Sequence, residues 1–160
     1  MAAVMLDIDN AESLDHPPAS QIQQWLTATF EHLNHPGGQV ALSIVTENTI
    51  TELNTTYRNQ NKPTNVLSFP FEFPPGLPAD AFDLQPLGDM VICPMILKKE
   101  ADQQQKTILD HWAHLIIHST LHLLHYDHQT PDQANIMENL EIIILKKFKI
   151  ANPYQEHCHD

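Results

Sequence analysis

HWAHLIIHSTLHLLHYDH, residues 111–128, is the segment on which the fold of this chain depends, and it holds six of the eleven histidines. At about 100° per residue, five of the six fall within roughly 80° of one another on one face of an α-helix. They are His111, His114, His118, His122 and His125. Large apolar residues, among them Trp112, Ile116 and Leu121, occupy much of the remaining surface. The segment therefore predicts a helix buried in the protein rather than one lying on its surface.

The spacing of these histidines also predicts a metal site. Two histidines four residues apart on a helix can bind one divalent ion, because their Cβ atoms lie about 6 Å apart. Both His114 with His118 and His118 with His122 have this spacing. A continuous helix would carry His128 off the shared face, so the helix must end near residues 124–125 and turn back. We expect His118, His122 and His128 to bind zinc and to leave its fourth position open, as in catalytic zinc sites.

The pattern H-x-x-x-H-x-x-x-x-x-H is also the ligand spacing of the metzincin proteases. Those enzymes carry their general-base glutamate directly after the first histidine, where this chain has Ser119. A metallopeptidase therefore remains an alternative that lacks its central catalytic group.

Four blocks of sequence carry a more specific resemblance. They are NTTYRNQNKPTNVLSFPFEFPPG (54–76), LGDMVIC (87–93), HWAHLIIH (111–118) and HSTLHLLHYDH (118–128). In this order they resemble the motifs of the bacterial YbeY family of single-domain, metal-dependent endoribonucleases. The family signature has glycine where this chain has Ser119 and His125. His125 falls where the helix stops and a left-handed residue is common, so histidine is expected to cost on the order of 1 kcal/mol there.

The resemblance implies a single-strand-specific endoribonuclease that acts in maturation of the 3′ end of 16S rRNA and in ribosome quality control. Arg58, the only arginine, matches the family arginine assigned to catalysis or RNA phosphate contact, which suits its planar guanidinium. A zinc-activated nucleophile would attack a phosphodiester while Arg58 stabilises the developing charge. His114 is a candidate acid or base, with a buried, hydrogen-bonded ring as the alternative. Asp127 is expected either to hydrogen-bond a ligand imidazole or to cap the turn.

Composition and charge restrict the partners. The 160 residues carry a net charge of −12, which argues against a broad basic face for nucleic acid. We expect RNA as the substrate, no DNA, no membrane, and a ribosomal protein or GTPase as a protein partner. No apolar run approaches 18 residues and the acidic start is unlike a signal peptide, so a cytoplasmic location is expected. A non-catalytic, metal-stabilised factor that docks on the ribosome is the second alternative.

The rest of the chain alternates between strand and helix patterns. Strands are expected at 4–9, 40–46, 65–73 and 88–93, and helices at 20–33 with Ser20 as cap, 49–58, 94–105, 108–125 and 131–150. Pro70 places the third strand at an edge or at a bulge, and the third and fourth strands are expected to pair antiparallel. The prediction is a single α+β domain over 1–160, with a small mixed four-stranded sheet, about five helices, and a frayed tail at 151–160.

Overall fold

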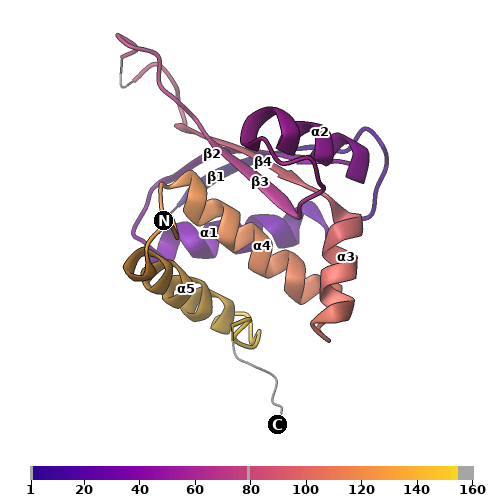
Figure 1. The fold of residues 1–160 in the computed structure, drawn as a ribbon. Coiled ribbons are helices and arrows are strands. Elements are labelled where there is room, and N and C mark those ends of the chain that lie inside the picture. Colours follow the sequence, from indigo (N-terminus) through magenta and orange to yellow (C-terminus); the bar gives the residue numbers. More distant parts are fainter. Residues whose placement is uncertain (1, 79, 155–160) are drawn as a thin grey trace.

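Four strands and five helices follow one another along the described residues, 2–78 and 80–154, of the computed structural model (Figure 1). Their bounds are β1 Ala3–Asp9, α1 Ala19–His32, β2 Gly37–Ile44, α2 Glu47–Arg58, β3 Val66–Pro70, β4 Pro86–Ile92, α3 Pro94–Gln103, α4 Ile108–Leu123 and α5 Pro131–Lys146. The predicted α+β class is confirmed. No helix in this part of the chain has the length and apolar character needed to cross a membrane.

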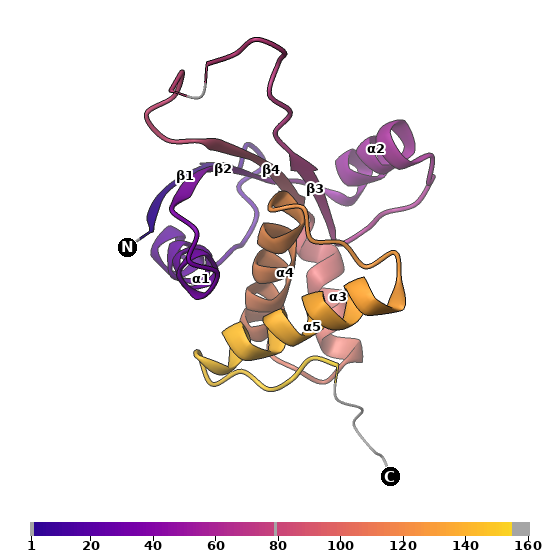
Figure 2. The same ribbon diagram turned by 90° about the vertical axis from the view of Figure 1, so that its left-hand side faces the viewer.

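The sheet is mixed, as predicted, and its strand order is β1-β2-β4-β3. β1 pairs with β2 and β2 with β4 in parallel, whereas β3 runs antiparallel to β4. Pro70, which has no N–H to give to a ladder, ends β3 at the sheet edge. Figure 2 shows α2 on one face of the sheet and the other four helices on the opposite face.

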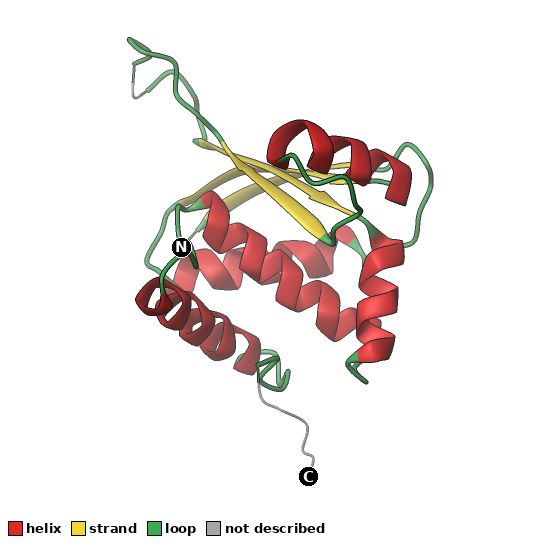
Figure 3. Ribbon diagram, in the orientation of Figure 1, coloured by secondary structure: helices red, strands yellow, loops and turns green. Residues whose placement is uncertain are grey.

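Helix α4 lies at the centre of the helical layer and packs against α1, α3, α5 and β3 (Figures 1 and 3). Its Ile116 and Ile117 are fully buried, and Trp112 is 2% exposed. The predicted burial of this helix is therefore confirmed. Because the neighbouring helices and the sheet hold α4 in place, the side chains that project from its C-terminal half have fixed positions.

Several predicted boundaries are wrong by a few residues. The side chain of Ser20 caps no helix, since α1 begins at Ala19 and has no side-chain cap. Thr46 does not extend β2 but caps α2, where its side chain accepts a hydrogen bond from the Thr49 N–H. α5 ends at Lys146 rather than at residue 150. Residues 155–160 of the predicted tail lie outside the described residues, whereas Tyr154 hydrogen-bonds to α5.

Candidate metal centre

His118 and His122 lie one turn apart near the end of α4, and their rings meet edge to face. Their Nε2 atoms are 3.2 Å apart and their ring centroids 4.6 Å apart. The helix is held in this position by its buried face, and its first turn is capped by Thr107, which accepts from the Asp110 N–H. Two of the three predicted ligands are thus placed by one rigid element.

The third, His128, is brought back by the turn that ends α4. The Tyr126 N–H bonds to the Leu121 carbonyl and the His125 N–H to the His122 carbonyl, which is the Schellman pattern of a helix end. His125 has φ +73°, so the predicted left-handed residue is confirmed. After this reversal the His128 ring lies 5.7 Å from the His118 ring and 5.0 Å from the His122 ring.

The three imidazoles fit a bound metal ion. One ring nitrogen of each lies within 4.8 Å of the others. Two nitrogens bound tetrahedrally to zinc at about 2.0–2.1 Å would be about 3.3 Å apart, close to the observed Nε2 separation of 3.2 Å. Burial, with His118 and His128 nearby, lowers the pKa of His122 to about 4, so its ring is neutral near pH 7 and can donate a lone pair. The cluster could therefore hold a metal ion through three imidazoles.

A buried carboxylate, Glu141 of α5, orients His118 from behind. Its Oε2 accepts from His118 Nδ1 at 2.9 Å and its Oε1 from His114 Nε2 at 2.7 Å. The side chain is 1% exposed. Burial would raise the Glu141 pKa, but the hydrogen bonds from His114 and His118 outweigh it and lower the pKa to about 2. An ionised Glu141 requires a proton on His118 Nδ1, which leaves Nε2 free for metal.

His114 belongs to this support and does not join the three-histidine cluster. Its Nε2 is shared between Glu141 and the Tyr154 hydroxyl, which also donates to Glu141. Burial lowers the His114 pKa. His114, His118 and Glu141 form a second group that could hold a metal. However, the His118 and His114 nitrogens that it would use are those already bonded to Glu141.

Arg58 and Asp127 occupy different surroundings. Arg58 is exposed at the end of α2, a helix that lies on the sheet face opposite α4, and it has no ion pair with any residue of 2–78 or 80–154. Its predicted role in charge stabilisation stays a prediction. Asp127 accepts a hydrogen bond from the His128 N–H at 2.8 Å, and its Oδ1 lies 4.0 Å from His128 Nδ1. The turn-capping alternative for Asp127 is the one that the hydrogen bond supports.

Ser119 points away from the cluster. Its hydroxyl is fully buried and lies 2.6 Å from the Ser68 hydroxyl of β3. The position that carries a general base in metzincins therefore serves here to join α4 to the edge strand. This contact weakens the metallopeptidase alternative further.

Sequence reasoning did not single out Glu141. The residue follows Met137 by four positions and precedes Ile144 by three, and both of these are buried. Helical periodicity thus places a carboxylate on the apolar face of α5, where an acidic side chain needs partners. A single glutamate on that apolar face was therefore the feature of the sequence that could have indicated a buried, partnered carboxylate.

Comparison with known proteins gives consistent matches along the chain. The family model described as Endoribonuclease YbeY matches residues 7–149. A relative from Halorhodospira halophila, named Endoribonuclease YbeY, is 45% identical over 156 residues, covering 98% of this chain and 99% of its own. One of the same name from Francisella tularensis subsp. holarctica is 47% identical, with 94% of each chain covered. The solution structure of TM1509 from Thermotoga maritima is similar in fold, with a TM-score of 0.55 at 21% identity over 98% of this chain and 99% of that one.

Proposed function

This chain belongs to the YbeY family of endoribonucleases, and we propose that it cleaves single-stranded RNA at a metal centre formed by His118, His122 and His128. The observation that carries the proposal is the pair of Nε2 atoms 3.2 Å apart on α4, with the His128 ring beside both. Because Glu141 holds a proton on His118 Nδ1, His118 Nε2 carries a lone pair, and at this distance His122 Nε2 either donates a proton to it or shares a cation with it. A bound divalent ion would take the place of that proton.

The residues present suit zinc, which when bound would lower the pKa of water and neutralise charge on a phosphate oxygen. His118, His122 and His128 would hold the ion through neutral rings. Glu141 keeps the Nδ1 proton of His118 in place, as acidic partners of metal-binding histidines commonly do. Zinc is proposed from the donor set alone, one ion per chain.

Arg58 is proposed to contact a phosphate of the RNA. The edge strand β3 lies between α2, which carries Arg58, and α4, which carries the histidines (Figures 1 and 2). An RNA strand crossing this edge could meet both. The guanidinium has no carboxylate partner among the described residues, so its two-pronged hydrogen bonding is available to an anion. His114 is also proposed as an acid or base. Because its Nε2 is hydrogen-bonded to Glu141, it would exchange its proton with that carboxylate.

The biological setting follows from the family and from the charge. We propose a role in maturation of the 3′ end of 16S rRNA and in ribosome quality control, in the cytoplasm. The net charge of −12 suits a basic partner such as a ribosomal protein, with a GTPase as the other class expected. Copurification of the full chain with ribosomal particles would test the setting, and recovery of neither class of partner would count against it.

The central test measures zinc content and RNA cleavage on one preparation. His118→Ala should lose both, whereas Arg58→Ala should keep zinc and lose cleavage of single-stranded RNA. His16→Ala, on a histidine far from α4 in sequence, serves as the matched control and should change neither. Unchanged zinc content in His118→Ala would remove the proposed site.

The same assay separates the two alternatives. A metallopeptidase would hydrolyse casein and spare RNA, and chelation would stop that hydrolysis. A non-catalytic ribosome-binding factor would bind ribosomal particles equally well with Arg58→Ala and would cleave no RNA in either form.

A further inference from the structure

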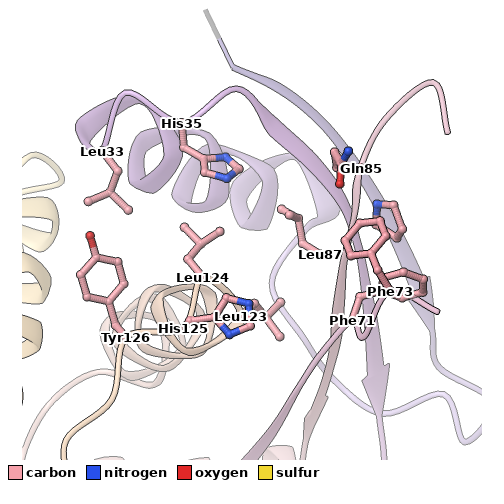
Figure 4. Close-up of a pocket in the computed structure, with 11 residues that line it drawn as sticks. Leu33, His35, Phe71, Phe73, Gln85, Leu87, Leu123, Leu124, His125 and Tyr126 are labelled. Atoms are coloured by element: carbon pink, nitrogen blue, oxygen red, sulfur yellow. The ribbon is translucent and has the colours of Figure 1, made fainter. Parts of the chain in front are cut away.

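A cavity of about 320 Å³ opens beside the turn that follows α4 (Figure 4). The rings of Phe71 and Phe73 lie on one side of it and the ring of His35 on another, with Leu87 and Leu124 between them. The volume falls at the lower end of the range for small-molecule sites, about 300–1,000 Å³. It is large enough for one planar ring system and too small for a folded partner.

The cavity is continuous in sequence with the metal centre. Residues 123–126 line the cavity, and they are four of the five residues between the proposed ligands His122 and His128. His125 lies there because its left-handed conformation, φ +73°, turns the chain at this point. A group bound in the cavity would therefore lie next to the turn that positions His128.

One wall of the cavity can stack against a flat ring. Phe71 and Phe73 form an edge-to-face pair with centroids 4.9 Å apart, and Phe73 is 47% exposed. Phe82 joins this pair, at 6.0 Å from Phe71 and 6.5 Å from Phe73, but it does not line the cavity. Exposed aromatic rings beside a nucleic-acid site are typical stacking surfaces for unpaired bases.

The opposite wall offers a fixed hydrogen-bond donor. His35 Nδ1 accepts from the Gly37 N–H at 2.9 Å, and its ring packs on Phe30 with centroids 5.3 Å apart. Burial lowers the pKa of His35, so the ring is neutral and its proton is on Nε2. The cavity thus combines stacking surfaces with a donor in a defined orientation.

Charge distinguishes this cavity from its neighbour. None of its eleven lining residues is Asp, Glu, Lys or Arg. The second cavity at the base of the same 71–85 segment is lined by Asp7, Glu72 and Asp89. In a protein with a net charge of −12, the first cavity can accept part of an anionic polymer, whereas the second repels it.

We infer that this cavity binds one unpaired nucleobase of the RNA, stacked on Phe73 and hydrogen-bonded to His35, beside the turn that joins His122 to His128. The inference rests on the proposed function and gives it a physical basis for preferring single strands. A base paired in a duplex cannot enter, because its faces are stacked and its hydrogen-bonding edge is occupied.

The test is an equilibrium titration of a fluorescein-labelled single-stranded RNA with the full chain, in which fluorescence anisotropy reports binding. EDTA is present so that metal-dependent cleavage does not consume the RNA. Phe73→Ala should weaken binding by about 5-fold or more, the lower end of base–aromatic stacking. Phe73→Tyr should restore it. Phe82→Ala, which removes a ring of the same cluster outside the cavity, should bind as the parent does.

A scan with one abasic ribonucleotide at successive positions makes the assignment specific. One position should weaken binding to the parent and to Phe82→Ala, yet cause no further loss in Phe73→Ala, because the same contact is removed twice. Equal losses in Phe73→Ala and Phe82→Ala, or no position that depends on Phe73, would overturn the inference. If the inference is overturned but the parent still cleaves RNA in a metal-dependent way, the proposed function survives. If the parent shows no such cleavage, the proposed function and the inference both fail.

Discussion

Glu141→Gln is expected to weaken zinc binding about 10- to 100-fold, the usual cost of losing a partner that orients a metal ligand. The substitution keeps size and burial but replaces an acceptor that carries charge with an amide. If the amide N–H₂ faces His118 Nδ1, that nitrogen must accept and the ring proton moves to Nε2. The His118 ring would then present a proton, rather than a lone pair, toward His122.

The magnitude agrees with the contacts that are lost. Glu141 accepts from His118 at 2.9 Å and from His114 at 2.7 Å, and its side chain is 1% exposed. A hydrogen bond to a charged group contributes about 1.5–3 kcal/mol. A 10- to 100-fold loss corresponds to about 1.4–2.7 kcal/mol, so loss of the His118 bond alone accounts for it.

Competition titration with a chromophoric chelator measures the zinc affinity. Glu100→Gln is the matched control. Glu100 of α3 accepts from His111 Nε2 at 2.8 Å, and His111 lies on α4 but outside the three-histidine cluster. Glu100→Gln should retain the parent affinity. Circular dichroism of the metal-free proteins checks that both variants fold.

Parent-like zinc affinity in a folded Glu141→Gln protein would refute the reasoning. An equal loss in both variants would refute it as well, since the effect would then come from general destabilisation of α4. Only a loss confined to Glu141→Gln supports the orienting role.

Three further predictions concern stability. His125→Gly should relieve the left-handed strain at φ +73° and raise the melting temperature by about 2–4 °C, while His125→Ala should not; equal melting temperatures in a thermal scan would contradict this. Tyr154→Phe should lower the free energy of unfolding by about 1 kcal/mol in urea, because it removes the hydroxyl that donates to Glu141, and no change would show that this contact contributes nothing. Burial raises the Glu100 pKa, but hydrogen bonds from His111 and Asn65 outweigh it and hold the pKa below its ordinary value, so the stabilisation is present above the ordinary glutamate pKa and is lost as the pH falls through the lowered one. The parent should therefore lose stability more steeply than Glu100→Gln in acid, and parallel pH curves would exclude this contribution.

The clustering of the three histidines could be predicted because they are close in sequence. His118 and His122 are linked by helical periodicity, and the position of His128 requires only that α4 end near residues 124–125. The antiparallel pairing of β3 with β4 and the edge position of β3 followed less directly, from the closeness of the two strands in sequence and from Pro70, whereas the order of the four strands did not follow from the sequence. Local rules are sufficient wherever the contact is made within one element or one turn.

The support of the centre could not be predicted in the same way. Glu141 reaches His118 across 23 residues, and only the packing of α5 on α4 brings them together. The same holds for Ser68 and Ser119, which are 51 residues apart, and for His35, which comes from the α1–β2 connection. Periodicity shows which face of a helix is buried, but it does not show which residue of another element lies opposite.

The charge of the chain decides which interactions can hold RNA. Eight Lys and Arg residues oppose twenty acidic ones, and Lys99 is already paired with Glu47 at 3.3 Å. Phosphate neutralisation by a broad basic face is therefore not available to this protein. The affinity proposed here comes instead from a divalent ion, one arginine without an ion pair among the described residues, and an uncharged cavity with aromatic walls. Of these three, the cavity requires an extended strand with exposed bases, so the same scarcity of positive charge that weakens duplex binding favours single-stranded RNA.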